Sequence, residues 1–175
     1  LSSPFQDPLG LLMHFDIDLT ANWDREKKDK IIRIVNTLTN LDLVTFQCSK
    51  RCQGEKIING KFILYGEIYN EKELIHNSNK NIFWLRKILN KKIRIGLENN
   101  NYYSTPAYEI VTDPEFISKI INKNNIYFLL DLAHTKITSI NKKINFNDYF
   151  YSLPLSKTIQ IHFCNYSIDE RGNAL

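Results

Sequence analysis

The segment IYFLLDLAH, residues 126–134, is the most informative stretch for the fold. Its first five residues are apolar without interruption, and the run ends at Asp131. A continuous apolar run of this length is typical of a parallel strand that is covered on both faces, because a strand with one wet face alternates instead. The segment therefore predicts a buried parallel strand over 126–131, with Asp131 at its end and His134 just beyond.

Similar runs recur along the chain and are separated by stretches with apolar residues at helical spacing. Strands alternating with helices in this way predict a parallel α/β fold, either doubly wound or a barrel. The chain contains no P-loop and no Gly-x-Gly-x-x-Gly turn, which counts against a doubly wound dinucleotide binder. Strands are expected at 11–17, 41–48, 93–98, 126–131 and 158–164, a further strand or hairpin at 57–69, a helix pair or one interrupted helix at 71–89, and helices at 24–38, 113–121 and 145–151.

Length and composition describe one ordinary domain over residues 1–175. Hydrophobic residues make up 43% and charged residues 24% of the 175 positions, and no apolar run approaches the roughly 20 residues of a membrane span. A full barrel of this class has about 250 residues, so we expect the barrel in this chain to lack about two strand-helix units.

Charge and cysteine usage bear on partners and compartment. The net charge of +4 is spread over scattered lysines, which indicates solvated surfaces and not a nucleic-acid patch. Three cysteines are an odd number, which argues against a disulfide framework and for a reducing compartment. With no secretion signal at the start of the sequence, a cytoplasmic location is expected.

Polar residues interrupt or end the predicted strands at corresponding places. In a parallel barrel the carboxyl ends of the strands meet at one face, where active sites are built. Carboxylates and imidazoles together suit iron, zinc or manganese. The alternative is that each histidine is a satisfied core residue and each carboxylate a helix cap. The residues expected to converge are His14, Glu98, Asp131, His134 and His162.

Other histidine and cysteine positions carry weaker signals. Cys48 and Cys52 are separated by a spacing that zinc can use, but no second Cys/His pair of structural-zinc type follows. We interpret both as core or incidental cysteines. His76 lies in a polar stretch of a predicted helix and is expected to be exposed.

The strand-end motifs resemble those of known families. Asp131-Leu132-Ala133-His134 resembles the Asp-x-x-His strand end of xylose-isomerase-like barrels, which include sugar isomerases and endonuclease-IV-type enzymes. The ordered series from Ile93 to His162 resembles the uncharacterised-domain family that includes the multinuclear non-heme iron oxygenases of methanobactin-type peptide biosynthesis. That series contains Glu98-Asn99, residues 102–109, residues 113–117, the Asp131 and His134 strand end, Tyr149, Leu153-Pro154-Leu155 and Gln160-Ile161-His162.

This resemblance implies a TIM-type barrel with two or three irons that modifies cysteine residues of a ribosomally made peptide. A partner protein that presents the peptide is implied as well. The implied catalytic residues and metal ligands are Glu98, Asp131, His134 and His162, with His14 as a further ligand. The residues implied to face the substrate are Asn99, Asn101, Tyr103 and Glu109.

Two alternatives remain open at this point. Gln47 stands where relatives often have a ligand histidine, and the chain ends before the position of a later Asp-x-His pair, which suits a non-catalytic binding protein on a decayed barrel. The second alternative is a hydrolase or isomerase that uses zinc or manganese on the same barrel, because such metals activate water or polarise a carbonyl. Metal content distinguishes all three hypotheses.

Overall fold

A computed structural model describes residues 11–58 and 61–174 of the chain. It contains strands and helices in alternation, as the apolar runs predict. In chain order they are β1 (Leu11–Asp18), α1 (Arg25–Thr37), β2 (Leu41–Gln47), β3 (Cys52–Ile58), β4 (Lys61–Ile68), α2 (Glu71–Ile88), β5 (Arg94–Glu98), α3 (Pro114–Asn124), β6 (Tyr127–Asp131), α4 (Leu132–Lys142), α5 (Phe146–Ser152), the 3-10 turn η1 (Leu155–Lys157) and β7 (Thr158–His162).

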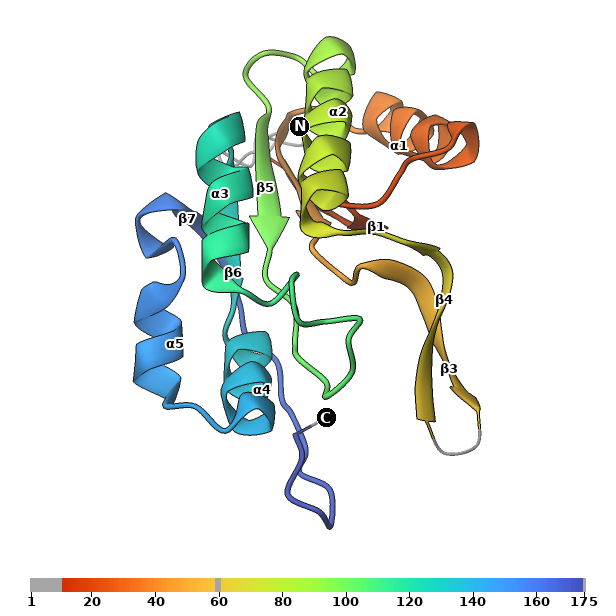
Figure 1. Cartoon of the computed structure of the whole chain (residues 1–175). Helices are drawn as coiled ribbons and strands as arrows, with labels where there is room; N and C mark the ends of the chain where they lie inside the picture. Colours follow the sequence, from red (N-terminus) through yellow and green to blue (C-terminus); the bar gives the residue numbers. More distant parts are fainter. Residues whose placement is uncertain (1–10, 59–60, 175) are drawn as a thin grey trace, which may run out of the picture.

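Five strands form one parallel sheet in the order β1-β2-β5-β6-β7. This confirms the predicted parallel α/β fold. The strands follow one another in chain order without a reversal, as they do in a barrel and unlike a doubly wound sheet, whose ligand crevice lies where the order reverses. Helices α2 and α3 lie over the front of the sheet in Figure 1. Closure of the sheet into a barrel remains a prediction.

The two faces of the sheet differ in chemistry. On the helix-covered face, Phe15 pairs in register with Phe46, their rings stack at 5.1 Å, and the row continues through Leu97 to Phe128. These residues belong to the main hydrophobic core. The neighbouring register row, which faces the other way, begins with the polar residue His14. The sheet therefore separates an apolar core from a polar face.

A glycine shapes this polar face. His14 is in register with Thr45, and Thr45 is in register with Gly96. A Cβ at Gly96 would lie 2.9 Å from the Thr45 methyl carbon, which is closer than carbon atoms normally approach. Because only glycine leaves this space, Gly96 lets the Thr45 side chain lie across β5.

Several element boundaries differ from those predicted. Helix α4 is absent from the prediction, and α2 is one continuous helix where a helix pair or an interrupted helix is expected. The segment expected as a strand or hairpin is an antiparallel hairpin that begins earlier, at Cys52, and it extends away from the sheet in Figure 1. Strand β7 ends at His162, two residues before the predicted end, and α3 continues past 121 to Asn124. Within the described part of the chain, no helix is long and apolar enough to span a bilayer.

Candidate metal centre

Three side chains meet at the carboxyl ends of three adjacent strands. Glu98 is the last residue of β5, Asp131 of β6 and His162 of β7, and one ligand atom of each lies within 4.8 Å of those of the other two. Asp131 is in register with His162, so the parallel pairing sets the two side by side. Glu98 and Asp131 are each only 3% exposed. We call these three residues the strand-end triad.

Glu98 lies between two imidazoles. Its Oε1 is 3.0 Å from His162 Nδ1, and its Oε2 is 3.3 Å from His14 Nε2. Burial raises the pKa of the Glu98 carboxyl to about 7; the His134 side chain opposes this shift, and the negative charge of Asp131 adds to it. A carboxyl placed in this way takes up a negative charge readily only when a cation is close by.

His14 enters the site from the middle of β1. Its Nδ1 is hydrogen-bonded to Thr45 Oγ1 at 2.9 Å, which holds the ring with Nε2 toward Glu98. The His14 ring centre is 5.6 Å from that of His162. Burial, followed by the nearby His162, lowers the pKa of His14, so the neutral imidazole that a metal requires is favoured.

Asp131 connects the triad to helix α4. It is the N-cap of that helix, and its Oδ1 accepts a hydrogen bond from the backbone N–H of His134 at 2.8 Å. The His134 Nδ1 is 2.8 Å from the carbonyl oxygen of Asn99, to which it can only donate, and 3.9 Å from Asp131 Oδ2. Donation to a backbone carbonyl fixes the tautomer that presents Nε2 as a ligand, a common arrangement of metal-binding histidines. His134 lies beside the strand-end triad and outside it.

The residues expected to face a substrate occupy three different settings. Asn99 is buried: its amide nitrogen donates to the Asp131 carbonyl at 3.0 Å, and its amide oxygen accepts from the Asp131 N–H at 2.8 Å. It therefore braces the ends of β5 and β6. Asn101 donates to the Tyr103 hydroxyl at 2.8 Å, and both are half-buried. Glu109 is exposed and lines a separate pocket with Glu71 and Lys119.

Three residues that contact the site residues do not lie at strand ends and were not among the expected ligands. Thr45 is fully buried and holds His14, Gln160 Nε2 is 3.0 Å from His162 Nε2, and Cys164 Sγ is 3.7 Å from Asp131 Oδ2. Gln160 and Cys164 are two residues before and two after His162. For Gln160 the sequence holds a signal, because side chains alternate along a strand and Gln160 and His162 therefore share one face of β7.

The donor set fits a transition metal. Two buried carboxylates and one imidazole form the triad, and His14 and His134 add imidazole nitrogens at its edges. Mixed carboxylate and imidazole ligands suit iron, zinc and manganese. Two acidic side chains buried this closely also need a compensating positive charge, which a divalent ion supplies. The residues present could therefore hold such an ion between Glu98, Asp131 and His162.

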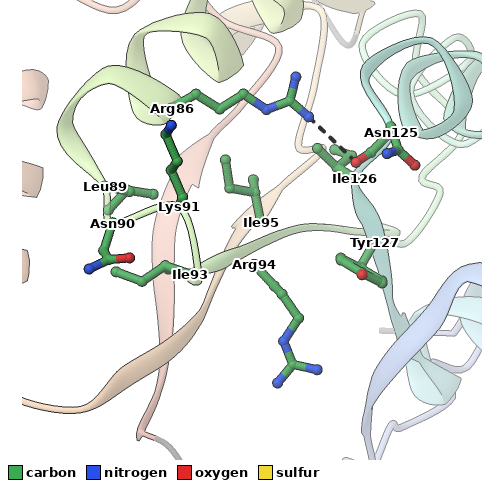
Figure 2. Close-up of a pocket in the computed structure, with 10 residues that line it drawn as sticks. All are labelled: Arg86, Leu89, Asn90, Lys91, Ile93, Arg94, Ile95, Asn125, Ile126 and Tyr127. Atoms are coloured by element: carbon green, nitrogen blue, oxygen red, sulfur yellow. Dashed lines mark hydrogen bonds between the residues drawn. The ribbon is translucent and has the colours of Figure 1, made fainter.

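A separate pocket of about 440 Å³ opens at the other end of the strands. Figure 2 shows Arg94 and Tyr127 among its lining residues, and these are the first residues of β5 and β6. The triad contains the last residues of the same two strands. This pocket is therefore not part of the candidate metal centre.

Comparison with known proteins places the chain in a family. Residues 67–173, more than half of the chain, match the family described as RiPP precursor modification enzyme MbnB/TglH/ChrH. The chain belongs to this family. The finding confirms the resemblance drawn from the strand-end motifs, and the matched range includes Glu98, Asp131, His134 and His162.

Curated relatives of this MbnB/TglH/ChrH family member carry only a family designation. A UPF0276 protein of Vibrio parahaemolyticus is 22% identical over 99 residues, which are 57% of this chain and 34% of the relative. A UPF0276 protein of Caulobacter vibrioides is 25% identical over 71 residues, which are 41% of this chain and 25% of the relative. The matches thus span about a third of the Vibrio relative and a quarter of the Caulobacter relative.

Proposed function

We propose that the chain provides the metal-binding strands of an iron-dependent oxidoreductase that modifies a ribosomally made precursor peptide at cysteine. The observation that carries this proposal is the buried Glu98, Asp131 and His162 group, in a chain whose family is named for modifying such precursors. The geometry supplies the ligand residues, and the family supplies the class of reaction.

The arrangement of the histidines supports more than one metal position. His14 approaches Glu98 from β1, and His134 approaches Asp131 from the start of α4, on a different element. Each carboxylate of the triad therefore has a second imidazole nearby: His14 directs its Nε2 at Glu98, and His134, whose Nδ1 donates to the Asn99 carbonyl, keeps its Nε2 as a ligand atom. A carboxylate has two oxygens and can serve two ions, so this set suits the two or three irons implied by the family resemblance.

Bound iron would supply the oxidative chemistry, and the residues of this chain would hold and orient it. Asn99 fixes the ends of β5 and β6 relative to each other through its two hydrogen bonds to Asp131. Thr45 and Gln160 contact the outer nitrogens of His14 and His162 and so set the directions of those rings. His162 and His134 are each partly exposed, at 32% and 22% of their side chains, which gives a peptide access from that side.

The test is an oxidation assay on a defined peptide. Metal-free protein is loaded with Fe²⁺ without oxygen and mixed with a synthetic cysteine-containing precursor peptide, with and without a partner protein that presents it. Air is then admitted, and the peptide mass is measured. We expect a mass change that requires both iron and oxygen, that is lost in Glu98→Gln, and that persists in Glu26→Gln, a control at an exposed acid of α1.

Other outcomes contradict the proposal in different ways. A mass change with zinc or manganese and no oxygen would indicate a hydrolase, which the same donor set also suits. Iron binding without any change in the peptide would indicate a binding protein, and so would failure to bind any metal.

A further inference from the structure

Cys164 lies next to the strand-end triad and is not used by the function proposed above. It follows β7 two residues after His162, and its Sγ is 3.7 Å from Asp131 Oδ2 and 3.9 Å from Asp131 Oδ1. Both carboxylate oxygens of a buried candidate ligand are thus within reach of one sulfur atom. We propose that Cys164 is a sulfur ligand of the metal held by Asp131, an inference that rests on the metal centre of the proposed function.

The separation of the two donor atoms matches two ligands of one ion. Zinc–sulfur bonds of about 2.3 Å and zinc–oxygen bonds of about 2.1 Å at a tetrahedral angle place the two donors about 3.6 Å apart. The observed distance of 3.7 Å between Sγ and Oδ2 is close to this value. A metal ion between the two atoms would therefore require little movement of either side chain.

The other two cysteines of the chain are hydrogen-bonded to backbone carbonyls, and Cys164 differs from them. Cys48 is buried and its Sγ donates to the carbonyl of Val111 at 3.5 Å, and Cys52 is buried with its Sγ 3.0 Å from the carbonyl oxygen of Gly54. Cys164 is exposed and faces a carboxylate. A thiol at the open side of the site can lose its proton to solvent as a metal binds.

A sulfur ligand would change which metals the site prefers. The triad alone offers oxygen and nitrogen donors, and its carboxylates also suit magnesium and manganese. A thiolate adds a soft donor, and this shifts preference toward iron, cobalt and zinc. Cys164 thereby selects the class of metal, in addition to holding it.

Cobalt is the probe that distinguishes coordination from a simple S–H hydrogen bond. Metal-free wild-type protein, Cys164→Ser and the control Cys52→Ser are titrated with Co²⁺. Visible d–d bands report binding by any ligands, whereas a near-ultraviolet charge-transfer band requires a sulfur ligand. We expect the charge-transfer band in the wild type and in Cys52→Ser, and its loss in Cys164→Ser together with a fall in cobalt affinity of about tenfold or more.

Two results would overturn this inference, and they separate it from the proposed function. The first is visible bands without a charge-transfer band in the wild type, or a charge-transfer band that persists in Cys164→Ser. Either would mean that the metal centre binds cobalt but Cys164 is not a ligand. No cobalt binding by the wild type means that the metal centre itself is wrong, and Cys164 with it.

Discussion

Thr45 is a buried hydroxyl that positions a candidate metal ligand, His14. Its Oγ1 is the hydrogen-bond partner of His14 Nδ1, at 2.9 Å, and Gly96 leaves the space in which its methyl lies. Thr45→Val keeps the shape and removes this bond. We expect metal affinity to fall about 10- to 100-fold, because the outer partner of a ligating histidine fixes its orientation. Unfolding free energy should fall by about 1 kcal/mol.

Titration calorimetry with Fe²⁺ or Zn²⁺ measures this affinity, and Thr112→Val is the matched control. Thr112 is also fully buried and its hydroxyl donates to a backbone carbonyl, that of Tyr108, at 2.8 Å. Equal affinity losses in the two variants would show that Thr45 has no specific role at His14.

Glu98 predicts a pH dependence of the metal-free protein. Burial raises its pKa to about 7 in the folded chain, against 4.5 for the free side chain. The folded state therefore binds more protons than the unfolded state between these values, and the Glu98 contribution to stability is complete below pH 4.5 and lost as the pH rises through 7. Glu98→Gln has no such proton to lose.

Urea unfolding with a chelator present, at pH 5 and at pH 8, tests this dependence. The unfolding free energy of Glu98→Gln, relative to the wild type, should be higher at pH 8 than at pH 5. A difference that is the same at both pH values would contradict a raised pKa at Glu98.

At the scale of the element, helix α4 begins at a residue that has two tasks. Asp131 belongs to the triad, and it also caps α4 through its bond to the His134 N–H. Asparagine caps helices as well as aspartate does, whereas alanine at this position costs about 1 kcal/mol. Asp131→Asn should therefore lose metal but keep the stability of the metal-free chain, and Asp131→Ala should lose both.

Metal analysis and urea unfolding of the two variants, side by side in chelator, separate these tasks. Equal stability of Asp131→Asn and Asp131→Ala would show that the cap contributes nothing. Metal retained by Asp131→Asn would remove Asp131 from the ligand set.

The elements that the sequence pattern missed share a physical cause. Buried polar side chains interrupt their apolar periodicity. Helix α4 buries Thr135, whose hydroxyl accepts a hydrogen bond from the Asn99 amide, and α2 buries Asn81, whose amide donates to the carbonyls of Leu19 and Ala21. A hydropathy pattern counts such residues as exposed because their partners come from elsewhere in the fold. The strands of the parallel sheet contain dense apolar runs, so their positions were predictable.

The same distinction applies to the site. Glu98, Asp131 and His162 were predictable because a carboxylate or imidazole at the end of a buried apolar run conflicts with its surroundings unless it has a function. The roles of Thr45 and Gln160 depend on which strand lies beside which. Pairing of β1 with β2 sets Thr45 against His14, and this information is contained in the register and not in the local sequence.

At the scale of the whole molecule, sheet order produces the site. Because β5, β6 and β7 are adjacent and parallel, their carboxyl ends lie at one edge of the sheet, and β1 adds His14 from the far side of β2. The region that this chain shares with the Vibrio relative is about a third of that relative's length. Closure of the barrel and the complete reaction are therefore proposals. The three strands that carry the candidate metal centre, β5, β6 and β7, all lie in the part of the chain that the structure describes.

The most direct test of the metal centre is elemental analysis of protein purified without oxygen, comparing His162→Ala with His76→Ala. Both variants remove one imidazole, but His76 is exposed on α2 and away from the triad. The triad predicts bound iron in the wild type and in His76→Ala, and little or none in His162→Ala. Equal metal content in the two variants, or a wild type without metal, would contradict a metal centre at the ends of β5, β6 and β7.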